Sequence, residues 1–283
     1  MIPSYRMPKH LHHRMRFLGK TINEIGDENV KAICESILAL QSPNPEVSIV
    51  IIAWNEERNL VATIDSLSGL KTDKRIEIIA VDNNSSDLTA ETIKRLGVQY
   101  VFEGTQGYAP ARQAGLNNAV GEFVLSADAD TLYPEFWVNS MLAPFKNKDV
   151  AFVSGLYAFY LPSVKRPLAL RLFQIAKHLS IWLKKFKRPH LVCMGGTSAY
   201  RKSKALEVGG YDVSLGEIRG EDGTLAWYLA KTGKIVILKG RRGMVWTSMR
   251  RTMGDGTLWE AFKIRMNRDL KQFGELLTKQ TKR

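Results

Sequence analysis

The chain contains little cysteine and no long apolar run. Its two cysteines, Cys34 and Cys193, lie far apart in 283 residues and suggest no disulfide framework, which fits a reducing compartment. No stretch approaches about 18 uninterrupted apolar residues, so we expect no transmembrane helix. The basic N-terminus lacks an apolar core before a small-residue cleavage site, so we expect no signal peptide. These absences favour a cytoplasmic protein.

Acidic residues are too few to balance the basic ones. The chain has 41 Lys and Arg against 28 Asp and Glu, which gives a formal net charge of +13. Such an excess favours anionic partners: nucleic acid, anionic lipid or phosphorylated substrates. The apolar share of 45% is ample for a core, and the length fits one large domain or one domain with appendages.

Apolar runs alternate with helical stretches from residue 47 onward. The pattern predicts strands at 47–53, 76–81, 98–102 and 122–127, and helices at 57–70, 86–96 and 109–120. Alternation of this kind implies βαβ units, and so an α/β fold with a mainly parallel sheet flanked by helices.

The first 45 residues do not share this alternation. We interpret residues 1–45 as a basic N-terminal extension with a helix at 21–40, and residues 46–283 as the main domain. The spacing of His10, His12 and His13 suits no common metal site. A solvated basic tail is therefore expected at the start of the chain.

Three of the predicted strands end in acidic or amide side chains. Trp54-Asn55-Glu56-Glu57 follows the first strand, Asp82-Asn83-Asn84-Ser85-Ser86-Asp87 follows the second, and Asp128-Ala129-Asp130 follows the fourth. Parts of these segments also suit turns and helix caps. A shared ligand site explains better why such groups gather in a chain with a charge of +13. The site is not of the dinucleotide or Walker type, because no G-x-G-x-x-G follows the first strand and no Walker loop occurs.

The Asp128-Ala129-Asp130 triplet places two carboxylates one residue apart at the end of a buried strand. Side chains there face the crevice in which α/β folds bind ligands. Crowded carboxylates suit Mg²⁺ or Mn²⁺, which also binds phosphate oxygens. A D-x-D triplet alone is equally typical of a solvated turn, so its surroundings decide the interpretation.

In their order, these motifs resemble the family 2 glycosyltransferases, which have the GT-A fold. The matching segments are 47–57, 81–87, 107–115 (Gly-Tyr-Ala-Pro-Ala-Arg-Gln-Ala-Gly) and 126–130, and the resemblance runs from about residue 45 to residue 253. It implies a Rossmann-like GT-A sheet and an inverting transfer from a nucleotide-sugar, with a UDP-sugar as the expected donor. It also implies a Mn²⁺ or Mg²⁺ cofactor. Residues 46–130 would form the nucleotide-binding half and residues 131–283 the acceptor half.

The resemblance assigns donor contacts to the first half. Ala53, Asn55 and Glu57 would line the nucleoside. Asp82 would accept hydrogen bonds from the base edge, with Asn83 beside it at the donor.

The phosphate end of the donor is assigned to charged residues. Arg112 would lie near the base or the diphosphate, where a fixed cation suits phosphate. Without the surrounding motif, Arg112 would be interpreted as a surface arginine of a helix. Asp128 would face the ribose or sugar and share the metal with Asp130, the main direct ligand.

The second half would bind the acceptor and supply the base. Glu221 and Asp222 open a helix-like run, a position that N-capping and the helix macrodipole also explain. In the family an acidic pair at this place supplies the catalytic base, which the resemblance assigns to Asp222, with Glu221 orienting the acceptor or the loop. Gly195 and Gly196 would bring backbone close to the acceptor.

A segment near the end of the chain resembles the family segment that closes over the diphosphate. Arg250 and Arg251 are the residues expected to form this clamp. The segment departs from the Gln-x-x-Arg-Trp pattern of processive polysaccharide synthases, which argues for transfer of a single sugar.

A basic amphipathic helix is predicted near residues 165–188. This segment contains eight Lys or Arg residues and no acidic residue, with an apolar stripe at helical spacing made by Leu168, Leu172, Ile175, Leu179, Trp182, Leu183 and Phe186. Packing on the protein's own core would explain the stripe. An all-basic opposite face (Lys177, Lys184, Lys187, Arg188) favours a helix lying in an anionic leaflet. We therefore expect peripheral attachment to the cytosolic face of a membrane.

The predicted function is a metal-dependent inverting glycosyltransferase acting on a glycan or lipid-linked hydroxyl acceptor in cell-envelope or polysaccharide synthesis. A sugar nucleotidyltransferase of similar fold is one alternative, but it should carry a Gly-rich, Arg-containing loop after the first strand. A basic nucleic-acid-binding protein is the other. Its basic residues should be interleaved with aromatics, which these are not, so no nucleic-acid partner is expected.

Overall fold

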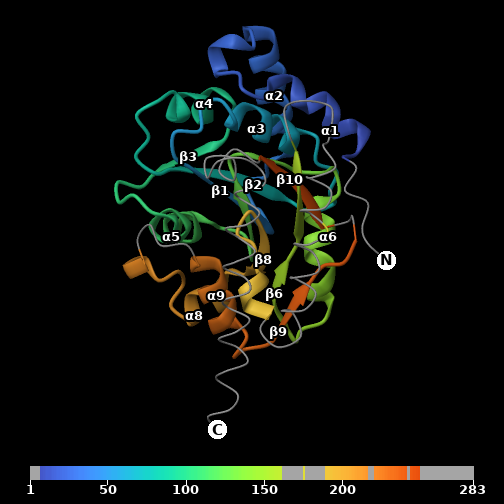
Figure 1. Ribbon diagram of the computed structural model, residues 1–283, viewed down its shortest axis with the longest axis vertical. Helices are drawn as coiled ribbons and strands as arrows, with labels where there is room; N and C mark the ends of the chain where they lie inside the picture. The colour runs from blue at the N-terminus through green and yellow to red at the C-terminus, as the bar shows by residue number, and fades with distance from the viewer. Residues whose placement is uncertain (1–6, 161–174, 176–188, 216–219, 241–242, 249–283) are drawn as a thin grey trace.

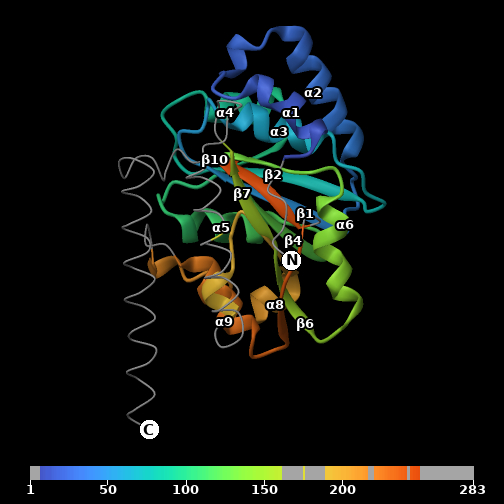
Figure 2. The same ribbon diagram turned by 45° about the vertical axis from the view of Figure 1, so that its right-hand side comes forward.

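A seven-stranded sheet forms the centre of the molecule (Figures 1 and 2). The computed structural model describes residues 7–160, 175, 189–215, 220–240 and 243–248. In spatial order the strands are β3 (Gln99–Phe102), β2 (Ile76–Asp82), β1 (Val47–Ala53), β4 (Phe123–Asp128), β8 (Thr197–Arg201), β6 (Val150–Ser154) and β9 (Lys234–Ile237). β8 is antiparallel to both of its neighbours, and all the other pairs are parallel. The predicted mainly parallel α/β sheet is confirmed.

The four predicted strands are β1 to β4, and their predicted bounds differ from the observed ones by at most one residue. The three predicted helices are also present, as α3 (Leu60–Ser68), α4 (Thr89–Arg95) and α5 (Tyr108–Asn118). α3 and α4 each begin three residues later than predicted. The reason is that the residues before them form two loops whose polar groups hydrogen-bond to each other.

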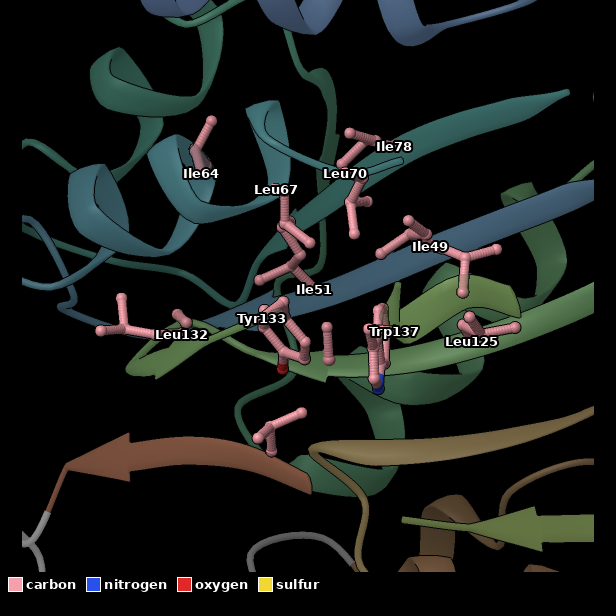
Figure 3. Close-up of a cluster of buried hydrophobic side chains, with 14 of the residues drawn as sticks. Ile49, Ile51, Ile64, Leu67, Leu70, Ile78, Leu125, Leu132, Tyr133 and Trp137 are labelled. Carbon is pink, nitrogen blue, oxygen red and sulfur yellow. The ribbon is translucent and has the colours of Figure 1, made fainter. Parts of the chain in front are cut away.

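Helices cover both faces of this sheet, which explains the mainly apolar sequence of β1 and β2. α3, α4 and α6 (Trp137–Leu142) lie on one face; α5, α8 (Lys202–Glu207) and α9 (Glu221–Leu229) lie on the other (Figures 1 and 2). Figure 3 shows Leu67 of α3 directed toward Ile51 of β1. Burying each such side chain contributes roughly 1.5–3 kcal/mol. Short 3₁₀ turns complete the described chain: η3 (Ala143–Lys146), η4 (Pro189–Val192) and η5 (Val213–Leu215).

A second, three-stranded sheet begins directly after Asp130. It contains β5 (Thr131–Leu132), β10 (Met244–Ser248) and β7 (Leu156–Tyr160), with β10 in the middle. The backbone N–H of Ser248 and the hydroxyl of Tyr160 both donate to the carbonyl of Asp130, at 3.1 and 3.3 Å. This small sheet therefore fixes the backbone at the end of the D-x-D triplet.

The N-terminal segment packs on α3. It comprises α1 (Lys9–Arg14), η1 (Met15–Phe17), η2 (Ile22–Glu24) and α2 (Asp27–Leu40). The helix predicted over 21–40 is present, divided into η2 and α2. The predicted solvated tail is wrong for residues 7–20, because Leu11 and Phe17 are buried in the same apolar cluster as the strands. The exposed side chains of this segment are mainly Lys, Arg and His, and the basic character of the segment concealed the apolar positions between them.

Two sequence predictions fall outside the described residues: most of the amphipathic helix near 165–188, and the clamp of Arg250 and Arg251. Within the part of the chain that the structure describes, no helix has the length and hydrophobicity needed to cross a bilayer.

An ion pair fastens the N-terminal segment to α3. The guanidinium of Arg14 contacts the carboxylate of Asp65 and donates to the hydroxyl of Ser68 at 3.3 Å. The Asp65 side chain is 1% exposed and that of Arg14 is 26% exposed. Burial raises the pKa of Asp65, and Arg14 opposes this increase. The carboxylate thus depends on Arg14 for its charge.

We expect Arg14→Ala to lower the free energy of unfolding by roughly 2–4 kcal/mol at pH 7, because it leaves a buried carboxylate without its cation. Losing Arg14 raises the folded-state pKa of Asp65 further. When the folded-state pKa of a carboxyl is raised, the free energy of unfolding falls as pH rises from the unfolded-state pKa, about 3.9, through the folded-state pKa. The loss in free energy of unfolding caused by Arg14→Ala should therefore be smaller at pH 5 than at pH 7. Urea denaturation at both pH values measures it.

Asp65→Asn should restore part of the loss in the Arg14→Ala background, because it removes the unpaired charge. Lys31→Ala is the control, since its side chain is 78% exposed and its ion pair with Glu35 lies at the surface. A deficit that is independent of pH and unaffected by Asp65→Asn would contradict this account.

Candidate functional site

A cavity of about 580 Å³ lies beside the end of β4 and the start of α9. Residues from distant parts of the sequence form its wall. Six of the residues predicted from the sequence line it: Arg112, Asp128, Gly195, Gly196, Glu221 and Asp222. The structure therefore brings the predicted base, one carboxylate of the D-x-D triplet and the glycine pair into one site.

Arg112 reaches this site because α5 packs closely on the sheet. α5 carries Pro110 in its first turn, where the missing N–H disrupts no helical hydrogen bond. One turn after Arg112, a Cβ at Gly115 would lie 2.2 Å from Val50 Cγ1, so only glycine permits this approach. Arg112 lies on the same face of the helix. Its guanidinium donates to the carbonyl of Ala127 at 3.0 Å.

The guanidinium of Arg112 lies between two carboxylates. Its Nη2 is 2.7 Å from Asp128 Oδ1, and its Nε is 3.6 Å from Asp222 Oδ1. The first contact is a charge-assisted hydrogen bond; the second is an ionic contact beyond hydrogen-bonding distance. Burial acts to lower the pKa of Arg112, but Asp222 and Asp128 outweigh burial and raise it. A fixed positive charge thus joins the end of β4 to the start of α9.

The carboxyl group of Asp222 has a strongly raised pKa in this site. Burial raises the pKa of Asp222 well above its usual range; Arg112 opposes this, and the charge and hydrogen bond of Glu221 add to it. Glu221 is itself buried and accepts a hydrogen bond from the backbone N–H of Gly220 at 2.9 Å. Perturbed carboxyl groups of this kind in a cavity are typical of proton-transfer sites.

The turn of Gly195 and Gly196 lies directly against both carboxylates. A Cβ at Gly195 would be 1.9 Å from Asp222 Oδ2, and a Cβ at Gly196 would be 2.2 Å from Asp128 Oδ2. Close backbone approach was expected from the sequence. The glycine backbone approaches the carboxylates of Asp222 and Asp128. Its contact with the acceptor stays a prediction.

Tyr133 is a positioning residue that the sequence did not reveal. Its hydroxyl accepts a hydrogen bond from the N–H of Asp128 and donates one to the carbonyl of Gly196, both at 2.8 Å. The ring is buried and packs on Trp137, with 4.4 Å between the ring centroids (Figure 3). Tyr133 therefore ties the end of β4 to the glycine turn. Nothing in its apolar surroundings in the sequence distinguishes it from a core residue.

Asp130 lies deeper than Asp128 and does not line the cavity. Its Oδ1 is 3.3 Å from the hydroxyl of Thr247 and 3.5 Å from that of Thr131. Among the described residues, no group of three or more His, Cys, Asp or Glu side chains is arranged for a metal. Two carboxylates still suit Mg²⁺ or Mn²⁺, which usually takes one or two from the protein and the rest of its ligands from phosphate and water. At Asp128 a metal would share the carboxylate with Arg112.

The residues predicted to bind the nucleoside form a separate group at the ends of β1 and β2. Ala53 and Asp82 are paired in register on these adjacent parallel strands. Asp82 is buried, and its two carboxylate oxygens accept hydrogen bonds from the N–H of Ser85 at 3.0 Å and the hydroxyl of Tyr100 at 3.3 Å. None of the predicted nucleoside residues lines the cavity.

The polar side chains around this group hold the loops together. Asn55 Oδ1 accepts from the N–H of Ser86 at 2.9 Å, and Glu57 Oε2 accepts from the N–H of Leu88 at 3.1 Å. Asn83 donates to the carbonyls of Glu103 and Thr105 and accepts from the N–H of Gly107. Contact of Asn55, Glu57 and Asn83 with a donor stays a prediction. Their observed role is to shape the loops that would surround it.

Comparisons with known proteins agree with this arrangement. The family model described as glycosyl transferase family 2 matches residues 48–209. An uncharacterized glycosyltransferase of Nostoc sp. is 31% identical over 114 residues, which cover 38% of this chain and 35% of the relative. The chain spans well under half the length of this curated relative.

Two solved structures show the same fold. Staphylococcus aureus TarS 1–349 in complex with UDP-GlcNAc is 17% identical with a TM-score of 0.54, covering 72% of this chain and 59% of that one. The mannosyltransferase PcManGT of Pyrobaculum calidifontis in complex with GDP-Man and Mn²⁺ is 19% identical with a TM-score of 0.53. That match covers 84% of this chain and 72% of the mannosyltransferase.

The contact of Gly196 with Asp128 predicts an energetic coupling. Gly196→Ala should lower the free energy of unfolding by roughly 1–3 kcal/mol, because its Cβ would displace the Asp128 carboxylate. In an Asp128→Ala background, where that carboxylate is absent, the same substitution should cost less, with a coupling of about 0.5–3 kcal/mol. Urea denaturation of the four proteins in the double-mutant cycle measures this coupling.

Gly104→Ala is the matched control, because a Cβ there meets only the ring of Phe102, at 3.6 Å. Equal costs of Gly196→Ala with and without Asp128 would mean that the glycine does not accommodate the carboxylate.

Proposed function

The chain belongs to glycosyl transferase family 2 and has its GT-A fold, and from this premise we propose that it transfers one sugar from a nucleotide-sugar donor to a hydroxyl acceptor with inversion. The observation that carries this proposal is that Asp128, from the middle of the family match, and Asp222, from beyond its end, converge on one buried arginine in the wall of a cavity. The likeness to solved nucleotide-sugar-dependent enzymes supports the reaction class.

In the proposed reaction, Asp222 acts as the general base. The acceptor oxygen attacks the anomeric carbon from the face opposite the leaving group. A new glycosidic C–O bond forms while the bond to the nucleoside diphosphate breaks, and the hydroxyl proton passes to the Asp222 carboxylate. Attack from the opposite face inverts the anomeric configuration. A positioned carboxylate contributes roughly 10²–10⁴-fold to such a step.

Arg112 would keep Asp222 usable as a base. Burial and Glu221 both favour the protonated form of Asp222, and Arg112 is the group that favours the carboxylate. Its second contact, with Asp128, fixes the guanidinium so that it cannot swing away from α9. Asp128, at the cavity wall, is placed to accept hydrogen bonds from hydroxyls of the donor sugar or ribose.

We assign the metal to Asp130 and Asp128, and the donor set supports Mn²⁺ or Mg²⁺. When bound, the ion would neutralise the charge that develops on the leaving diphosphate. Thr131 and Thr247 would hold the Asp130 carboxylate in place from the side of the small sheet. The solved neighbour in complex with GDP-Man and Mn²⁺ supports this assignment.

The finer features of the reaction are proposals from the sequence. We take a UDP-sugar as the donor, with its nucleoside at Ala53, Asn55, Glu57, Asp82 and Asn83 and its diphosphate clamped by Arg250 and Arg251. We take a glycan or lipid-linked molecule of the cell envelope as the acceptor. Attachment to the cytosolic face of a membrane rests on the basic sequence near 165–188.

Thermal-shift measurements with UDP-, GDP- and dTDP-sugars, with and without Mn²⁺, test the proposed function most directly, because specific binding stabilises the folded state. Stabilisation by one nucleoside class is expected. Identical melting temperatures with every nucleotide-sugar would contradict the proposal.

Asp222→Asn should reduce sugar transfer by at least about 10²-fold while leaving donor affinity nearly unchanged, because it removes the base but keeps the shape of the side chain. Initial-rate assays and donor titrations measure the two effects. Near-normal turnover in this variant would remove Asp222 from the base role.

The pH profile gives an independent measure of the same role. Below its pKa Asp222 already carries a proton, so turnover should rise as pH is raised through that pKa, which burial places above the usual carboxyl range. Glu221→Gln removes a charge that raises this pKa, so the acid limb of the profile should move to lower pH. An acid limb that stays in place would show that another group titrates.

Asp130→Ala should abolish the dependence of nucleotide binding on Mn²⁺, because the metal would lose its main protein ligand. Isothermal titration of the nucleotide with and without Mn²⁺ measures this dependence. Asp149→Ala is the control, since this exposed carboxylate pairs only at the surface, with Lys234. Unchanged Mn²⁺ dependence in Asp130→Ala would place the metal elsewhere.

A further inference from the structure

We propose that the outer wall of the cavity, around Trp227, is a subsite for an uncharged sugar ring of the acceptor, so that the acceptor class is a neutral glycan or glycoside. This inference rests on the proposed function and deepens it. It is carried by three observations: an exposed indole in the cavity wall, the packing around it, and the charge of the residues that line the cavity.

The first observation is the exposure of Trp227. Its side chain is 46% exposed although it lies on α9, the helix that also carries Asp222. Trp137 and Trp246, by contrast, are completely buried. Trp227 nevertheless lines the cavity, as does the half-exposed Leu191. Exposed apolar side chains that gather at a cavity beside converging polar groups are typical of a ligand subsite.

The second observation is that the indole is held in place. The ammonium of Lys231 lies 4.5 Å from the Trp227 ring and 5.3 Å from the Tyr228 ring. The rings of Trp227 and Tyr228 lie 5.1 Å apart. Below them, α9 approaches η4 closely, because a Cβ at Gly223 would be only 3.1 Å from the carbonyl of His190. A rigid aromatic surface costs little ordering entropy when a ligand packs on it.

The third observation is the sign of the charge. Of the described residues that line the cavity, three are acidic (Asp128, Glu221 and Asp222) and one, Arg112, is permanently basic. The whole chain has a net charge of +13, so this acidic wall does not follow from the composition. Carboxylates repel a phosphorylated or carboxylated acceptor and accept hydrogen bonds from neutral hydroxyls.

A pyranose fits both features at once. One face of the ring presents C–H groups, which can pack on the indole, and its edge presents hydroxyls, which can reach the acids. Asp222 and Trp227 line the same cavity, so a sugar bound at the indole would direct a hydroxyl toward the proposed base. This places the acceptor on the Trp227 side of the cavity and the donor sugar on the Asp128 side.

The test compares acceptors and variants at a fixed, saturating donor. The acceptor probes are octyl glucoside, octyl galactoside and octyl N-acetylglucosaminide, each against a charged counterpart with a 6-phosphate or a uronic acid ring. The variants are Trp227→Ala, Trp227→Phe and Phe136→Ala. Phe136→Ala is the matched control, because this aromatic side chain is also exposed but does not line the cavity.

We expect neutral glycosides to be used and their charged counterparts to be poor acceptors. Trp227→Ala should raise the acceptor KM about tenfold through loss of ring packing, while kcat and the donor KM stay nearly unchanged. Trp227→Phe should recover most of the acceptor affinity, and Phe136→Ala should behave like the wild type. Trp227→Leu is a second variant that keeps apolar volume without an aromatic face, and its KM should follow that of Trp227→Ala.

The outcomes separate the two levels of the proposal. An unchanged acceptor KM in Trp227→Ala and Trp227→Leu, with transfer intact, would overturn the subsite but leave the transferase. A preference for charged acceptors would also overturn it. If the wild type neither binds nor consumes any nucleotide-sugar, the proposed function fails and the subsite fails with it.

Discussion

The site depends on one buried guanidinium held between two carboxylates. Arg112 can lie there only because α5 approaches β1 at Gly115, and the carboxylates can approach it only because Gly195 and Gly196 leave room for them. Tyr133 joins the β4 end of this arrangement to the glycine turn. Removing either acid would leave a buried cation half compensated, and removing the cation would leave two acids in mutual repulsion. The three charges therefore fix the relative position of β4, α5 and α9.

Much of this architecture follows from the sequence. β1 and β2 were predictable because strands covered on both faces are mainly apolar, and the polar residues at their ends marked the edge where a ligand is expected. Arg112 and Asp222 were assigned only through the order of the motifs, since each alone also suits a surface helix or a helix cap. Tyr133 and Trp227 could not be found this way, because an aromatic residue in an apolar stretch has the same signal whether it packs in a core or serves a site. The burial of Leu11 and Phe17 was hidden by the positive charge around them.

The site has two parts with different physical demands. At the ends of β1 and β2, the buried Asp82 and Asn83 are embedded in hydrogen bonds to neighbouring loops, which would suit the proposed recognition of the donor. In the cavity, Asp222 is largely shielded from solvent and lies beside the buried Glu221, which gives a proton site that is costly to ionise. Recognition requires groups that keep one charge state, whereas proton transfer requires a group that can change it. Their separation on different elements lets each environment be set independently.

The same reasoning explains why arginine suits position 112 better than lysine. A lysine could lose its proton when buried, whereas a guanidinium stays charged and offers donors in several directions. Arg112 uses them for the Ala127 carbonyl and the Asp128 carboxylate, with Nε directed to Asp222 at a distance too long for a hydrogen bond. That longer contact favours the ionised form of Asp222 without a hydrogen bond that would compete with an incoming proton. A shorter distance between Arg112 and Asp222 would lower the basicity of Asp222. At a longer distance, burial and Glu221 would keep Asp222 protonated.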